Sequence, residues 1–118
     1  MNVTQPLVQG DTLNFTITPV DVQTGLPVSL DDAADIVVKV SPAGTRTIAL
    51  EKDFSDGVEV IQYQGSDAIF FSIATDESSE LLGRYFYEAE VTQDNGDVFT
   101  VRNRNSLPGS FTIIEDSI

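Results

Sequence analysis

The segment from Leu82 to Val101 constrains the fold more than any other part of the chain. Across residues 82–91, two sets of side chains alternate with a period of two, which is typical of a strand with one buried face and one mostly solvent-exposed face. The expected inward side chains are Tyr85, Tyr87, Ala89 and Val91. Asn95 and Gly96 then supply the positive φ angles of a tight turn. Residues 98–101 follow as the second strand, which runs back along the first. The segment therefore predicts a β-hairpin.

The residues just before this hairpin resemble a known structural corner. Residues 75–80 offer a cap residue and early carboxylates, so they predict one helical turn. A strand, a turn and then Leu-Gly-x-Tyr-x-Tyr is similar to the corner of immunoglobulin-type sandwiches, where a tyrosine hydrogen-bonds back across the loop. Tyr85 is then the corner residue and Tyr87 a packing residue. Two ordinary core tyrosines would give the same pattern, and both interpretations predict the same fold.

The rest of the chain reads as short strands between polar turns. The cleanest is 12–18, with Leu13, Phe15 and Ile17 inward. Further strands are expected at 28–30, 35–41, 46–52, 58–63, 68–73 and 110–114. Their inner residues are expected to include Ile36, Val38, Val40, Ile48 and Leu50.

Two connections complete this prediction. Residues 30–34 are expected to form a single helical turn, and residues 102–109 a polar loop. About eight or nine short strands, with turns every 8 to 12 residues or so, predict an antiparallel, immunoglobulin-like β-sandwich. At 118 residues, the chain is long enough for one such domain spanning 1–118.

The first ten residues carry no charged side chain before Asp11 and include Pro6. Because proline lacks the donor that a central strand needs, residues 1–10 are expected to be an extended arm or an edge strand.

The net charge of −13 should repel nucleic-acid backbones and anionic lipid surfaces. We therefore expect no nucleic-acid partner. No apolar run is long enough to cross a bilayer, so no membrane partner is expected either. The N-terminus has no basic-then-apolar leader, which predicts synthesis in a cytoplasm.

The chain contains no histidine and no cysteine, which removes the usual general base, the thiolate nucleophile and the preferred ligands of zinc. We therefore expect no catalytic residues and no cofactor. A carboxylate pair and a calcium site remain as alternatives. The acidic turns that raise the calcium question are Asp31-Asp32-Asp35, Asp53-Asp56 and Asp94-Asn95-Asp97. Aspartate and asparagine are common in turns for purely local reasons, so the sequence predicts no metal site there.

Arg84, Arg102 and Arg104 make up half of the basic residues. They are expected either to pair internally with Glu88, Glu90 or Asp97, or to meet an acidic neighbouring subunit.

Taken in order, several segments resemble a module of tailed-phage structural proteins. These are Gln9 to Ile17, Asp21 to Ala33, Leu82 to Glu88 and Asp94 to Asp97. The pattern is similar to the N-terminal domain of siphophage baseplate upper proteins and related immunoglobulin-like modules on phage particles. In those proteins a long arm segment follows, whereas here the sequence stops at Ile118 soon after the last strand. The resemblance therefore implies an accessory virion subunit rather than an arm.

The resemblance implies a non-enzymatic virion protein, with the capsid decoration or cement role expected first. Its partners would be other virion proteins, either the major capsid protein or tail and baseplate proteins. A homo-oligomer is a further option. The alternatives are a baseplate or tail-fibre adaptor, and an extracellular carbohydrate- or calcium-binding module. The partner-binding candidates are Asn2, Val3, Thr4, Gln5, Pro6, Leu7, Val8, Arg102 and Arg104, and the structural candidates are Tyr85, Tyr87, Asn95 and Gly96.

Overall fold

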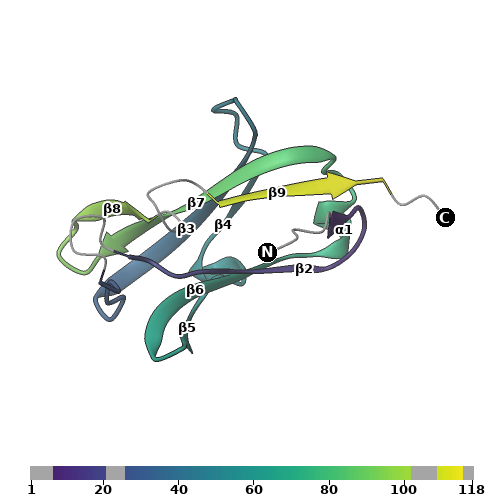
Figure 1. Cartoon of the computed structure of the whole chain (residues 1–118). Coiled ribbons are helices and arrows are strands. Elements are labelled where there is room, and N and C mark those ends of the chain that lie inside the picture. The colour runs from purple at the N-terminus through teal and green to yellow at the C-terminus, as the bar shows by residue number, and fades with distance from the viewer. Residues whose placement is uncertain (1–6, 21–25, 102–108, 116–118) are drawn as a thin grey trace.

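The computed structural model describes residues 7–20, 26–101 and 109–115, which form two β-sheets (Figure 1). The larger sheet has the order β1-β9-β7-β3-β4, with β8 also paired to β7, and the smaller has the order β2-β6-β5. The larger sheet consists of β1 (Leu7–Val8), β3 (Ala33–Pro42), β4 (Leu50–Lys52), β7 (Gly83–Gln93), β8 (Val98–Val101) and β9 (Gly109–Ile114). The smaller consists of β2 (Leu13–Ile17), β5 (Glu59–Tyr63) and β6 (Ser66–Ile73). The predicted all-β sandwich is confirmed.

Strand β7, the first strand of the predicted hairpin, organises the larger sheet. Along one edge it pairs with β3 from Tyr85 to Gln93. Along the other edge it pairs first with β9 and then with β8. Its alternation holds, because Tyr85, Tyr87, Ala89 and Val91 are all buried.

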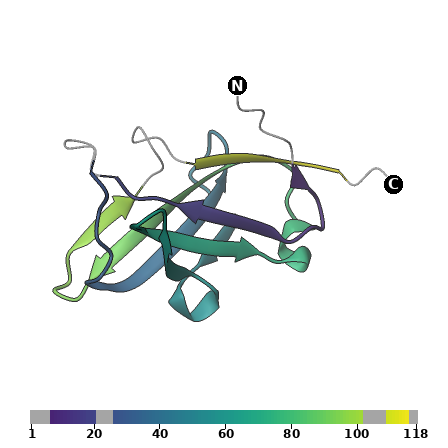
Figure 2. The same cartoon turned by 60° about the horizontal axis from the view of Figure 1, so that its bottom comes forward.

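The smaller sheet lies across the inner face of the larger one, and Figure 2 shows β2 and β6 passing in front of its strands. In the register of β2 and β6, Leu13 faces Ile73, Phe15 faces Phe71 and Ile17 faces Ile69. These pairs meet the buried residues of β3, including Ile36, Val38 and Val40, in one hydrophobic core.

Two short helices connect strands. The 3-10 helix η1 (Phe54–Asp56) follows β4, and the helix α1 (Thr75–Ser78) bridges β6 to β7, as the sequence predicts. The N-cap residue of α1 is Ala74, which lies just before the stretch 75–80, and the Glu77 carboxylate accepts a hydrogen bond from its amide at 2.9 Å. In the described ranges, no helix is long and apolar enough to cross a bilayer.

Several local predictions are wrong. Residues 31–32 form a turn rather than part of a helix, and β3 already begins at Ala33, where a register shift between Ala33 and Asp35 accommodates the entry. Residues 28–30 form no strand, although Val20 and Pro27 make an isolated bridge.

The predicted strand 46–52 is shortened to β4, and Ile48 is exposed rather than inward. Lys52 is the buried residue at this edge, because its ammonium finds a carboxylate partner there. Gly109 belongs to β9 instead of the preceding loop. Finally, β1 runs parallel to β9, so the larger sheet is mixed rather than purely antiparallel.

Candidate interaction surface

The space between the sheets is occupied by packed aromatic rings. Phe15 lies 5.0 Å from Phe71, 5.4 Å from Tyr87 and 4.9 Å from Phe111, measured between ring centroids. Tyr85 stacks on Phe111 with 5.6 Å between ring centroids. These rings come from β2, β6, β7 and β9, so they join the two sheets. Such ring pairs stabilise a core by about 0.5–1.5 kcal/mol beyond their buried area.

Tyr87 lies directly over Gly109, its cross-strand partner on β9. A Cβ atom built on Gly109 would lie 2.1 Å from Cζ of the Tyr87 ring, so only glycine fits. Burial raises the pKa of the Tyr87 phenol above its ordinary value. Tyr87 is therefore a packing residue, in keeping with its predicted structural role.

The hydroxyl of Tyr85 accepts a hydrogen bond from the Leu82 amide at 3.1 Å and lies 3.3 Å from the Leu82 carbonyl, to which it donates. The side chain thus bonds back to the backbone just upstream of its own strand, which is the contact expected of a corner residue.

At the β7–β8 turn, Gly96 has a φ of 91°. Among the described non-glycine residues only Gln64 has a positive φ, so the expectation that Asn95 takes one is wrong. The Gly96 amide bonds to the Gln93 carbonyl at 2.9 Å, and the Gln93 amide bonds to the Asp97 carbonyl at 2.8 Å. This is a longer hairpin loop with one left-handed glycine. Asn95 supports it by accepting the Asp97 amide at 2.9 Å.

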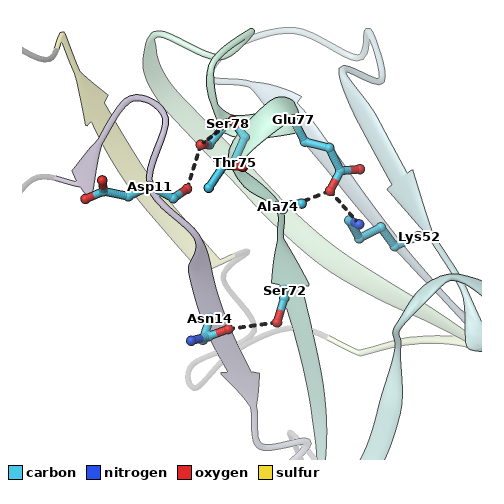
Figure 3. A network of polar contacts seen from close by, with 8 residues as sticks. All are labelled: Asp11, Asn14, Lys52, Ser72, Ala74, Thr75, Glu77 and Ser78. Carbon is cyan, nitrogen blue, oxygen red and sulfur yellow. Dashed lines mark hydrogen bonds and ion pairs between the residues drawn. The ribbon is translucent and has the colours of Figure 1, made fainter.

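A polar network ties α1 to its surroundings (Figure 3). The Lys52 ammonium lies 2.7 Å from the Glu77 carboxylate, with side-chain exposures of 8% and 25%. Although partial burial raises the pKa of Glu77, the hydrogen bonds from Lys52 and the Ala74 amide and the Lys52 charge outweigh it and hold the pKa below its ordinary value. The fully buried Ser78 donates to the Asp11 carbonyl at 2.6 Å and accepts the Gly10 amide at 3.1 Å. This network is a structural anchor.

The acidic turns use their carboxylates locally. Asp53 accepts the amide and hydroxyl of Ser55 at 3.0 and 2.6 Å, and Asp35 accepts the Ile36 amide at 2.9 Å. At the third turn, the Asp97 carboxylate accepts a hydrogen bond from the Asn95 side chain at 3.2 Å. The main-chain amide of Asp94 also donates to the main-chain carbonyl of Asp32 at 2.9 Å. Within the described part of the chain, no group of three or more acidic side chains is arranged to hold a metal ion.

The predicted partner-binding residues divide into two groups. Leu7 and Val8 form β1 and pair in parallel with Ile113 and Ile114 of their own chain. Asn2, Val3, Thr4, Gln5, Pro6, Arg102 and Arg104 lie outside the described residues. Glu90, one of the acidic residues expected to pair with an arginine, instead has its carboxylate 3.4 Å from the Lys39 ammonium. The guanidinium of Arg84 lies over the Phe86 ring, 5.3 Å from its centroid.

Strand β5 is the surface feature that the sequence did not single out. It is paired on one edge with β6, and no strand in the described residues pairs with its other edge. Every residue of β5 except Ile61 is exposed, including Val60 at 38% and Tyr63 at 46%. The sequence identifies this segment as a strand, but weak alternation in Val58 to Tyr63 hides its place at the rim of the smaller sheet.

Comparison with models of known protein families found no match, and a search of curated proteins likewise returned no matching sequence.

Proposed function

We propose that this chain is a non-enzymatic structural subunit of a tailed-phage particle, which decorates the capsid by binding its assembled lattice. The proposal rests on the order of motifs that resembles phage virion modules. We also propose that the sandwich is immunoglobulin-like, which the hydrogen bond between the Tyr85 hydroxyl and the upstream Leu82 amide supports.

The observation that carries the proposal is the open edge of β5. Exposed edges are usually blunted by lysine, proline or a bulge, because they readily pair with another strand. Here the register from Glu59 to Tyr63 is continuous, and the strand contains neither lysine nor proline. A protein that offers such an edge, and lacks histidine and cysteine, is suited to attachment rather than to chemistry.

A lattice would strengthen this attachment. Each edge contact buries little area, but a subunit or oligomer that meets several lattice sites gains effective concentration without new contacts. The acidic surface keeps free subunits apart in solution, because like charges repel.

The proposal is tested by mixing purified protein with assembled shells and, separately, with unassembled major capsid protein of the phage that encodes it. We expect sedimentation with shells and none with the unassembled subunits. Absence of binding to shells contradicts the capsid proposal.

The second candidate function is a baseplate or tail-fibre adaptor, which the resemblance to baseplate upper proteins favours. Copy number separates the two candidates. Quantitative mass spectrometry of purified particles should find hundreds of copies for a shell protein and at most a few dozen for a tail protein.

A further inference from the structure

The main-chain groups of β5 can be assigned to its two edges. Gln64 and Gly65 form the loop to β6, with φ angles of 53° and 81°, and Tyr63 faces Ser66 across it. These angles are those of a type I′ turn, whose flanking residues exchange hydrogen bonds. Because such pairs alternate along an antiparallel ladder, Tyr63, Ile61 and Glu59 bond to β6. Val60 and Gln62 then direct their N–H and C=O groups to the open edge.

The side chains beside this edge are partly apolar. Val60 lies opposite the core residue Ile69, which assigns Val60 to the inner face of the smaller sheet. Ile61 and Tyr63 alternate with it on the outer face, opposite Ala68 and Ser66, where Ala68 is itself fully buried. An incoming strand would therefore find apolar contacts on both faces in addition to main-chain partners.

The charge of the segment that contains β5 defines the occupant. From Asp53 to Gly83 the chain contains no lysine or arginine. It contains acidic residues throughout this stretch, namely Asp53, Asp56, Glu59, Asp67, Asp76, Glu77 and Glu80. Of these, Glu77 is engaged by Lys52, and Asp67 accepts the Leu30 amide at 2.7 Å and a hydrogen bond from Gln62. Asp56, in η1 ahead of β5, and Glu59, the first residue of β5, are both exposed.

We infer that the open edge of β5 binds an extended, lysine- or arginine-bearing segment of another protein, which adds as an antiparallel or parallel strand beside Val60 and Gln62. A second copy of this chain is a poor occupant, since like charges directly opposite each other destabilise a strand pair. This inference rests on the proposed function and names the surface and chemistry of its contact.

The test uses the full chain and two synthetic peptides. Both alternate valine with a charged residue, which is lysine in one peptide and glutamate in the other. Titration is followed by the amide signals and hydrogen exchange of ¹⁵N-labelled protein. We expect the lysine peptide to shift the signals of residues 59–63 and to slow exchange of the Val60 and Gln62 amides, while the glutamate peptide leaves them unchanged.

Two matched pairs of variants locate the contact. Gln62→Pro removes the outward N–H, and Gln62→Ala removes the same side chain but keeps that donor. We expect Gln62→Pro to weaken peptide binding at least about fivefold and Gln62→Ala to change it little. Glu59→Lys should weaken binding as well, whereas Asp94→Lys, the same charge change at the β7–β8 turn, should not.

Several outcomes overturn the inference. They are equal binding of both peptides, shifts spread over all acidic surfaces, unchanged binding by folded Gln62→Pro, or self-association of the free protein that Gln62→Pro abolishes. If Gln62→Pro still sediments with shells, the proposed function stands and this edge is not its contact. If the lysine peptide binds the β5 edge but the protein does not sediment with shells, the edge inference stands and the capsid proposal fails.

Discussion

Gly109 on β9 lies directly against the ring of Tyr87 on β7. Gly109→Ala would place a methyl group inside the Tyr87 ring, so the ring must leave the aromatic cluster or β9 must shift. We expect a loss of about 3 kcal/mol in the free energy of unfolding, at the upper end for overpacked cores. Urea denaturation checks it, with Ser110→Ala on the exposed face of β9 as the control. A loss no larger than that of the control would contradict the packing.

The Lys52–Glu77 pair makes stability depend on pH at the acid side. Because the pKa of Glu77 is held below its ordinary value in the folded state, its contribution is fully present above the unfolded pKa, near 4.5, and is lost as the pH falls through the folded pKa. Asp67 contributes in the same direction, since the Leu30 amide and Gln62 lower its pKa.

Glu77→Gln should remove this part of the pH dependence and leave Lys52 buried without its counter-charge. We expect a loss of about 2 kcal/mol at pH 7. This is less than the roughly 3–5 kcal/mol of a fully buried pair, because Glu77 is a quarter exposed. Denaturation curves between pH 3 and pH 7, with exposed Glu80→Gln as the control, measure both effects. An unchanged acid slope in Glu77→Gln would assign the pH dependence elsewhere.

At the scale of the element, the Tyr85 hydroxyl fixes the entry into β7. Tyr85→Phe keeps the ring on Phe111 but removes the partner of the Leu82 amide. We expect a loss of about 1 kcal/mol and faster hydrogen exchange at Leu82. Exposed Tyr63→Phe serves as the control. Equal stability of the two variants would make Tyr85 an ordinary core residue.

The sequence predicts elements well where burial alternates. The inward residues of β2, β3 and β7 follow from their period of two, because one face of each strand meets the core. The sequence-based prediction fails at sheet edges, where long-range contacts decide which side chains are buried. Nothing local shows that Lys52 rather than Ile48 would be buried, since its partner Glu77 lies on α1. Similarly, the Asn-Gly signal predicts positive φ angles at Asn95 and Gly96, but only Gly96 has one, because the loop is longer than a two-residue turn.

For the candidate surface, sequence reasoning supplied only part of what is needed. It identified 58–63 as a strand, but whether a strand is central or at a rim depends on sheet order, which alternation does not encode. Leu7 and Val8 form an edge strand, which is one of the two options that the sequence predicts for residues 1–10, but their pairing with β9 depends on long-range contacts that the sequence pattern does not show.

At the scale of the whole molecule, the net charge of −13 opposes compactness. Raising the salt concentration from about 10 mM to about 150 mM shortens the Debye length from about 30 Å to about 8 Å, so this repulsion is screened. We therefore expect Tm at pH 7 to rise with salt in calorimetric scans. The rise should be smaller near pH 4, close to the sequence pI of about 4.1. A fall of Tm with salt at pH 7 would mean that attractive ion pairs dominate.

The parallel pairing of β1 with β9 gives the molecule a defined response to mechanical force. Leu7 and Val8 run in the same direction as Ile113 and Ile114, and the Gln9 amide adds a bond of 2.9 Å to the Ile114 carbonyl. Tension applied to the two ends of the chain pulls these strands past each other, so their bonds are loaded in shear and must break together. Under such tension we expect the chain to resist extension at the β1–β9 pair before its core unfolds.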